Sequence, residues 1–276
     1  MAISSEQATS RDIQAAGIKI HYNEVGSGYP VIMIHGAGPG ASSWSNFKQN
    51  ADAFAAKYRA LLVDMPQYGG SAKVIIEGGR LTYCANVFRD FMDKLGIDKA
   101  HFVGNSMGGQ VAIKLATDSP ERVSKLVVIG SGTGSPSLFC PMPLEGIKLI
   151  GGYYKGEGPS REKLRTLLQT LLYDSSFLTE DILEERYQAS IDPDVVRVMT
   201  AHPPAGESLA SQLPKVACPA LIVWGADDRF GALDVGLLML RSFQNARMHV
   251  FSHCGHWAQV EHAGEFNRLV LDFLDH

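Results

Sequence analysis

Long apolar runs and paired cysteines are both missing from this chain. No stretch approaches the length needed to cross a membrane, and the opening residues, MAISSEQATSRDIQ, lack the apolar core of a secretory signal. The cysteines form no C-x-x-C pair, so free thiols in a reducing compartment are favoured over a disulfide framework. They are Cys84, Cys140, Cys218 and Cys254. Together these absences predict a soluble, cytoplasmic protein.

A strong excess of charge of one sign is missing as well. The chain has 25 Lys and Arg against 29 Asp and Glu, a formal net charge of −4 over 276 residues. Surfaces that bind nucleic acid or anionic membranes need a basic excess, so we expect neither as a partner. A small molecule is the expected partner, and the length suits one large α/β core.

What the chain does have is a series of short apolar runs separated by helical segments. Runs of this length suit strands that are buried on both faces of a mostly parallel sheet. They are Val31 to Ile34, Ala60 to Val63, His101 to Val103, Leu126 to Ile129, Ala220 to Trp224 and Met248 to Phe251.

The strand signal disappears between residues 135 and 206. Leucines recur there at helical spacing behind Ser160, a candidate N-cap, and a second helix is predicted to start at Thr179 with acidic residues in its first turn. The leucines are Leu164, Leu167, Leu168, Leu171 and Leu172. We therefore expect an α/β core of residues 1–134 and 207–276, interrupted by a helical insertion at 135–206.

One charge in this insertion lies on an apolar helix face. Arg186 follows Ile182 by four residues, on the side that Leu183 and Tyr187 also mark. A guanidinium that points inward needs an anionic partner or a wet cavity. The alternative is that its head reaches solvent or pairs with a nearby carboxylate.

The segment Gly104-Asn105-Ser106-Met107-Gly108 has the G-x-S-x-G pattern of a nucleophile elbow, a tight turn between a strand and a helix. An apolar run precedes it, and apolar residues at helical spacing follow it. Such a turn lifts the serine hydroxyl clear of the sheet, and the two glycines leave room for the tight backbone. Ser106 is therefore the candidate nucleophile.

A serine nucleophile needs a base and an acid that orients the base, and in this kind of site both follow later strands. Asp227 and Asp228 follow the fifth apolar run, and Asp228 matches the expected loop better. His253 and His256 follow the last run. His256 is the better candidate, because Gly255 leaves it on a flexible loop tip beyond the strand.

The candidate oxyanion donors are two backbone N–H groups. Met107 directly follows the nucleophile, and Ala37 lies in the glycine-rich loop after the first apolar run, where Gly36 and Gly38 let the backbone approach a ligand closely. This loop lacks the pattern of a phosphate-binding loop. The histidine-rich stretch 249–256 lacks metal-ligand spacing, so no metal is expected.

Five segments, taken together, resemble those of a known enzyme family. They are His35-Gly-Ala-Gly-Pro-Gly-Ala41, Trp44-Ser-Asn46, Gly104-Asn-Ser-Met-Gly-Gly109, Trp224-Gly-Ala-Asp-Asp-Arg-Phe230 and Cys254-Gly-His-Trp-Ala-Gln259. The family is the meta-cleavage product hydrolases, carbon–carbon bond hydrolases of bacterial aromatic degradation within the α/β-hydrolase superfamily. The resemblance covers nearly the whole chain after residue 15.

The resemblance implies an α/β-hydrolase fold, with a mostly parallel eight-stranded sheet flanked by helices and a helical lid inserted after strand 6. It also implies no cofactor and a homo-oligomer, either a dimer or a tetramer. By position, Ser106, Asp228 and His256 match the family's catalytic triad, and Arg186 matches its carboxylate-binding arginine. Further candidate substrate contacts are Asn46, Asn105, Trp257, Phe230, Gly36 and Gly38.

The reaction that this resemblance implies is hydrolysis of a 2-hydroxy-6-oxo-hexa-2,4-dienoate with a substituent at C6. The products would be 2-hydroxypenta-2,4-dienoate and a carboxylic acid, which is benzoate-like if the substituent is aryl. His256 would shuttle a proton to C5 through a keto tautomer, Ser106 would attack the C6 carbonyl, and water would release the acid. Two alternatives stay open: a plain carboxylesterase with the same triad, and a ligand receptor on the same fold.

The sequence does not determine the substituent at C6. Several apolar residues around the insertion are candidates for an aryl pocket, and ordinary core packing is an equally good interpretation of them. They are Phe139, Met142, Leu144, Ile147 and Phe230.

Overall fold

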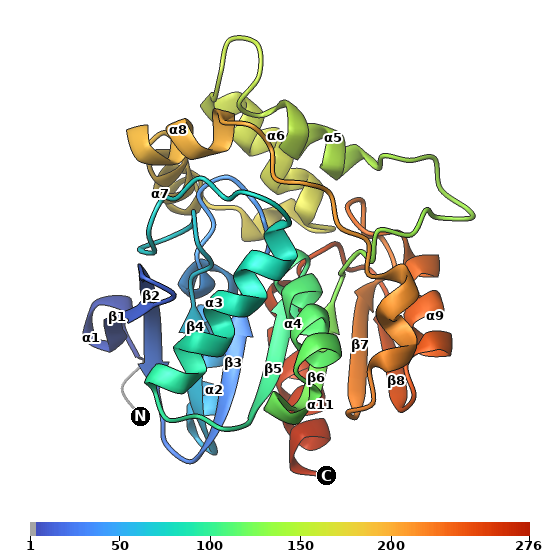
Figure 1. The fold of residues 1–276 in the computed structure, drawn as a ribbon. Helices are drawn as coiled ribbons and strands as arrows, with labels where there is room; N and C mark the ends of the chain where they lie inside the picture. Colours follow the sequence, from blue (N-terminus) through green and yellow to red (C-terminus); the bar gives the residue numbers. More distant parts are fainter. Residues whose placement is uncertain (1–3) are drawn as a thin grey trace.

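A computed structural model describes residues 4–276, in which eight strands form one mixed sheet with helices on both faces (Figure 1). The strands are β1 (Ser10–Ala15), β2 (Ile18–Val25), β3 (Tyr29–Ile34), β4 (Tyr58–Val63), β5 (Ala100–Asn105), β6 (Val123–Ile129), β7 (Ala220–Gly225) and β8 (Ala246–Phe251). Their order is β1-β2-β4-β3-β5-β6-β7-β8. Strand β2 runs antiparallel to β1 and β4, and the remaining neighbours are parallel. The predicted fold class is confirmed.

All six apolar runs that the sequence marks as strands are strands, and each of them gains one or more residues at an end. The hairpin of β1 and β2 had no such signal. Its burial alternates along much of β2, and β1 is mostly exposed at the edge of the sheet. An antiparallel edge that meets water on one face carries no continuous apolar run.

Helices cover both faces of the sheet and the ends of its strands. They are α1 (Glu6–Thr9), α2 (Ser43–Ala55), α3 (Arg80–Lys94), α4 (Met107–Asp118), α5 (Glu145–Gly152), α6 (Arg161–Leu171), α7 (Glu180–Ser190), α8 (Pro193–Thr200), α9 (Leu233–Ser242), α10 (Ala258–Glu261) and α11 (Ala263–Asp275). Three single-turn or short 3-10 helices accompany them, at Pro120–Arg122, Ser175–Phe177 and Ala210–Lys215. Helices α3, α4 and α9 bury one face of the sheet, and α2 and α11 bury the other (Figure 1).

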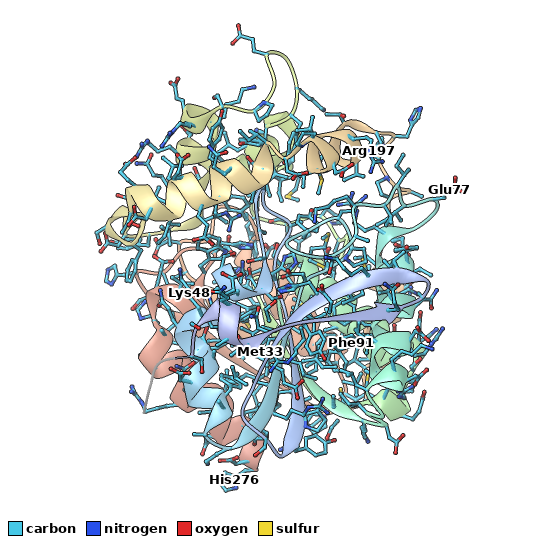
Figure 2. All side chains as sticks on the ribbon, turned by 90° about the vertical axis from the view of Figure 1, so that its left-hand side faces the viewer. Met33, Lys48, Glu77, Phe91, Arg197 and His276 are labelled. Carbon is cyan, nitrogen blue, oxygen red and sulfur yellow. The ribbon has the colours of Figure 1, made fainter. Side chains whose placement is uncertain are left out.

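Helices α5 to α8 form a layer above the carboxyl ends of the parallel strands, as Figures 1 and 2 show. The predicted N-cap Ser160 is confirmed, because its Oγ accepts a hydrogen bond from Lys163 N. Thr179, where the second helix was predicted to start, is the N-cap of α7, and its Oγ1 accepts a hydrogen bond from Ile182 N. The leucines of α6 are buried in a third apolar cluster, which also contains Phe230 from the loop between β7 and α9. This cluster fixes the helical layer over the strand ends.

The polar surface agrees with the even charge balance of the sequence. Lys48, Glu77 and Arg197 lie on the outside, whereas Met33 and Phe91 lie in the core (Figure 2). All four cysteines are free thiols, as predicted. Within residues 4–276, no helix has the length and apolar character needed to span a bilayer.

Candidate active site

Ser106 occupies a strained turn between β5 and α4. Its φ angle is +53°, in the region that residues with a side chain rarely adopt. A Cβ atom on Gly104 would lie 2.5 Å from backbone atoms of Gly108, and a Cβ on Gly108 would lie 2.2 Å from Ile34 O. The glycines of the elbow are therefore required by close backbone contacts, as the sequence pattern predicts.

We expect Gly104→Ala to lower the free energy of unfolding by at least about 1 to 3 kcal/mol, because the new methyl group meets backbone rather than a flexible side chain. A matched control is Gly264→Ala in α11, where the nearest atom is the end of Arg268 at 3.9 Å. This variant is expected to be unchanged or up to about 1 kcal/mol more stable. Urea unfolding of both variants checks the difference, and equal stability of the two would contradict it.

His256 and Asp228 form a buried pair at the ends of β8 and β7. His256 Nδ1 lies 2.8 Å from Asp228 Oδ2, and their side chains are 3% and 1% exposed. Asp228 Oδ1 accepts hydrogen bonds from the backbone N–H groups of Phe230 and Gly231, at 2.7 and 2.9 Å. The carboxylate is thus held in place, and it can orient the imidazole so that Nε2 is available for another partner.

The competing candidates from the sequence lie elsewhere. Asp227 is exposed, and His253 is exposed with its ring against Tyr173. His249 faces Glu265 at 4.0 Å. Among residues 4–276, no group of three or more His, Cys, Asp or Glu side chains lies close enough to hold a metal ion.

The two candidate oxyanion donors come from the start of α4 and from the loop after β3. Met107 is the first residue of α4, so its N–H has no partner within the helix. Ala37 lines the same small cavity as Ser106. His35 supports this loop, since its Nε2 accepts a hydrogen bond from Met65 N and its Nδ1 therefore donates to Gly36 O at 2.8 Å. Burial lowers the pKa of His35, which keeps it neutral in this role.

Arg186 points inward from α7, as the sequence predicts, and is 2% exposed. Its Nε and Nη2 donate to Pro39 O at 3.2 and 2.9 Å, and its guanidinium lies 5.3 Å from the ring centroid of Trp257. Nη1 is buried without a partner in the described chain. Burial lowers the pKa of Arg186 to about 10, so it stays charged at neutral pH.

Asn105, just before the nucleophile, also has an unused polar atom. Its Nδ2 donates to Ile129 O and His256 O, both at 3.3 Å, which fixes the orientation of the amide. Its Oδ1 is left buried without a partner in residues 4–276. An unpaired donor on Arg186 and an unpaired acceptor on Asn105 both indicate a missing polar ligand, because such groups are costly to bury alone.

Most of the predicted site residues line one small cavity. Its volume is about 20 Å³, which leaves room for little more than one water molecule. The lining includes Gly36, Ala37, Gly38, Asn46, Asn105, Ser106, Arg186, Phe230, His256 and Trp257. A Cβ on Gly36 would lie 3.1 Å from Ser106 Cβ, and one on Gly38 would lie 2.7 Å from Arg186 Nη2. Glycine at these two positions therefore leaves room for the side chains of Ser106 and Arg186 beside the loop.

The structure also brings in residues that the sequence did not single out for the site. Leu167 and Leu171 line the catalytic cavity, although their spacing indicated only a helix face, and Ile150, which had no signal in the sequence, lines it too. The suggested aryl pocket is wrong for three of its members. Phe139 and Met142 are 81% and 51% exposed, because the segment before α5 runs over the outside of the molecule (Figure 1), and Ile147 is 44% exposed on α5 itself.

Comparisons with known proteins agree with this geometry. The model of the alpha/beta hydrolase family matches residues 31–269. A 2-hydroxy-6-oxononadienedioate/2-hydroxy-6-oxononatrienedioate hydrolase from Paraburkholderia phymatum is 44% identical over 281 residues, covering 98% of this chain and 97% of that protein. A protein of the same name from Pseudomonas sp. is 45% identical over 261 residues, covering 92% and 91%.

A solved structure gives the same result. The meta-cleavage product hydrolase from Pseudomonas fluorescens superposes with a TM-score of 0.87 at 33% identity, covering 96% of this chain and 97% of that one. Fold and site together define an α/β hydrolase. Within that class, this chain belongs to the meta-cleavage product hydrolases, which hydrolyse a carbon–carbon bond in the ring-cleavage products of aromatic compounds.

Proposed function

We propose that this enzyme hydrolyses the C5–C6 bond of 2-hydroxy-6-oxononadienedioate, giving 2-hydroxypenta-2,4-dienoate and succinate. The printed names of relatives at 44% and 45% identity support this substrate, in which the C6 substituent ends in a carboxylate. The aryl-substituted substrate considered from the sequence is less well supported, since three of the proposed pocket residues are exposed.

The observation that carries the proposal is the buried, unpaired Nη1 of Arg186 in the cavity of Ser106. A charged donor in this position is stabilised by a carboxylate, which can accept two hydrogen bonds from one guanidinium. The adjacent C2 hydroxyl of a dienol can donate to Asn105 Oδ1, which is the unpaired acceptor of the same cavity. The dienoate end of the substrate therefore satisfies both groups.

The proposed mechanism begins with proton transfer, because a dienol cannot release a carbanion directly. His256, oriented by Asp228, moves a proton to C5 and produces the keto tautomer. Ser106 then adds to the C6 carbonyl while the N–H groups of Met107 and Ala37 stabilise the oxyanion. His256 accepts the Ser106 proton as the Oγ–C6 bond forms. The C5–C6 bond then breaks, its electron pair passes into the dienolate, and His256 returns the proton to give the 2-hydroxydienoate. Water hydrolyses the remaining ester, which releases succinate and restores the Ser106 hydroxyl.

The catalytic cavity is too small for the substrate, so part of the protein must move before the substrate can bind. About 20 Å³ does not hold a dienoate, since sites for small molecules usually measure several hundred Å³. Helices α6 and α7 contribute Leu167, Leu171 and Arg186 to the cavity wall. We therefore expect segment 135–206 to act as a lid that shifts when substrate binds.

Arg186→Gln tests the proposal. The variant loses a charge-assisted contact of about 2 to 4 kcal/mol but keeps helix propensity, so kcat/KM on the dienedioate is expected to fall by about 30- to 900-fold. Hydrolysis of a small neutral ester, which has no carboxylate to bind, is expected to change by less than about threefold. Steady-state assays of both substrates give the ratio.

A matched control is Arg165→Gln, which removes an arginine of the same helical layer that pairs with Glu180 at the exposed surface. Its kinetics should match the wild type on both substrates. Equal losses on dienedioate and ester in a folded Arg186→Gln enzyme would contradict carboxylate recognition. If the wild type cleaves esters but no dienoate, the carboxylesterase alternative is correct.

A further inference from the structure

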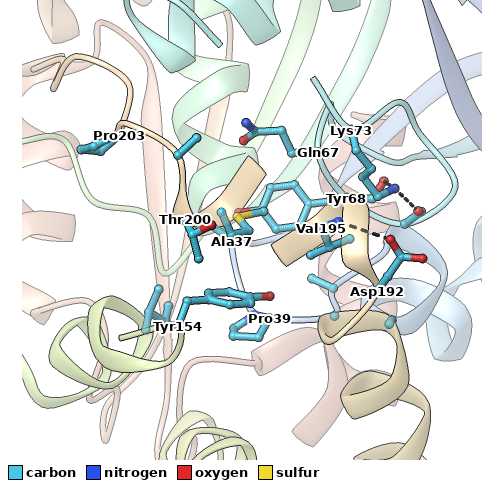
Figure 3. Close-up of a pocket in the computed structure, with 18 of the residues that line it drawn as sticks. Ala37, Pro39, Gln67, Tyr68, Lys73, Tyr154, Asp192, Val195, Thr200 and Pro203 are labelled. Carbon is cyan, nitrogen blue, oxygen red and sulfur yellow. Dashed lines mark hydrogen bonds between the residues drawn. The ribbon is translucent and has the colours of Figure 1, made fainter. Parts of the chain in front are cut away.

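A second, larger cavity adjoins the catalytic one. It has a volume of about 690 Å³ and shares Ala37, Gly38, Ala41 and Ile150 with the small cavity (Figure 3). Its other walls come from the loop after β4, the start of α3, the end of α5 and helix α8. Tyr68, Tyr154 and Thr200 are among the side chains drawn around it in Figure 3.

The larger cavity provides space that the catalytic cavity lacks. The dienedioate has nine carbon atoms, and only its reacting centre and dienoate end are needed beside Ser106 and Arg186. The rest of the molecule, from C7 to C9, must extend away from the nucleophile. The shared wall at Ala37, an oxyanion donor of the proposed mechanism, makes the larger cavity the adjoining space into which this end can extend.

Arg80 brings an available positive charge to this cavity. It is the first residue of α3, and its Nη1 lies 3.9 Å from Met107 Sδ. Within residues 4–276, Arg80 has no carboxylate within 4.0 Å. Arg80 and Tyr68 both line the cavity, and the charge of Arg80 and its hydrogen bonding to the Tyr68 hydroxyl oppose the rise in pKa that burial causes at that hydroxyl.

The other charged groups around the cavity are engaged or exposed. Lys73 Nζ donates to the carbonyl oxygens of Tyr68, Gly69 and Ser71. Asp192 caps α8 by accepting hydrogen bonds from the backbone, and Lys155 is exposed.

Glu207 lies near Arg80 but is also occupied. Its carboxylate accepts hydrogen bonds from Leu81 N and Thr82 N at the start of α3. Of the charged side chains that line this cavity in the described chain, Arg80 is therefore the one suited to an incoming anion.

We propose that this cavity takes the C6 substituent and that Arg80 binds its terminal carboxylate. The inference rests on the proposed function, and it makes Arg80 a residue that determines specificity, whereas Arg186 binds the carboxylate common to all dienoates. The distance is suitable, because Met107 follows Ser106 directly, consecutive Cα atoms are about 3.8 Å apart, and the Met107 side chain touches Arg80. Arg80 thus contacts the side chain of the residue that directly follows the nucleophile.

The test compares two substrates that differ only at C9, 2-hydroxy-6-oxononadienedioate and 2-hydroxy-6-oxonona-2,4-dienoate, whose chain ends in a methyl group. The wild type is expected to favour the dienedioate in kcat/KM. Arg80→Gln is expected to lose about tenfold to hundredfold on the dienedioate, mainly through KM, and at most about twofold on the methyl-ended substrate. Circular dichroism checks that the variant is folded.

Lys155→Gln is the control for a general effect of positive charge near the cavity, and we expect wild-type kinetics from it. The inference is overturned if Arg80→Gln loses kcat/KM equally on both substrates, if it loses on neither, or if Lys155→Gln shows the selective loss instead.

A selective loss of kcat/KM on the dienedioate in Arg186→Gln would mean that the substrate binds in the reverse orientation, with its terminal carboxylate at Arg186. If the wild type cleaves neither compound, the proposed function fails; if it cleaves both and Arg80→Gln changes neither, only this inference fails.

Discussion

Ser106→Ala is expected to bind the dienedioate and to cleave it at least about a thousandfold more slowly than the wild type in a single turnover. The substitution removes the only atom that forms the covalent bond in the proposed mechanism. It leaves Arg186, Asn105 and the oxyanion donors unchanged, so the affinity for substrate should change little. Stopped-flow absorbance of the bound dienoate measures binding and cleavage in the same experiment.

Ser131→Ala provides the matched control for this variant. Ser131 is buried beside Gly109 of α4 and donates to Ile129 O, but it does not line the catalytic cavity. Its removal should leave turnover close to the wild-type rate. Cleavage at a near-normal rate by Ser106→Ala would contradict nucleophilic catalysis, and the hydroxyl of water would then have to attack C6 directly.

His256→Ala is expected to lower kcat by about a hundredfold to ten-thousandfold, because one imidazole is assigned both proton transfers. Formation of the keto tautomer and cleavage of the C5–C6 bond should therefore both slow down. Stopped-flow spectra separate the two phases, since ketonisation removes the conjugation of the dienol before the bond is broken.

His253→Ala is the control on the same loop, because this histidine is exposed and lies against Tyr173 rather than in the cavity. It should behave as the wild type. An unchanged ketonisation phase in His256→Ala would assign the first proton transfer to another group, and only the cleavage role would remain with His256.

The sequence predicted the elements whose signal is local. Strands buried on both faces appear as apolar runs, and the caps Ser160 and Thr179 mark their helices because a side-chain oxygen satisfies a free N–H at the first turn. The elbow was also predictable, since close backbone contacts at Gly104 and Gly108 exclude other residues. The hairpin of β1 and β2 was not, because it lies at an exposed edge.

The sequence could not predict the contacts between segments that lie far apart in the chain. Arg186 could be recognised as an inward charge from its own helix, but its contact with Pro39 O depends on how α7 packs over the glycine-rich loop. Arg80 and Tyr68 come from segments with no motif, and only the fold brings them to one cavity and places Arg80 beside Met107. Phe139 was misassigned because an apolar side chain alone does not distinguish a pocket wall from an exposed loop.

The most direct test of the central claim is product analysis after complete turnover of 2-hydroxy-6-oxononadienedioate by the wild-type enzyme. The account predicts one equivalent of 2-hydroxypenta-2,4-dienoate and one of succinate for each equivalent of substrate consumed, with no product above background from Ser106→Ala on the same time scale. Recovery of intact dienedioate from the wild type, or of products from cleavage at any bond other than C5–C6, would contradict it.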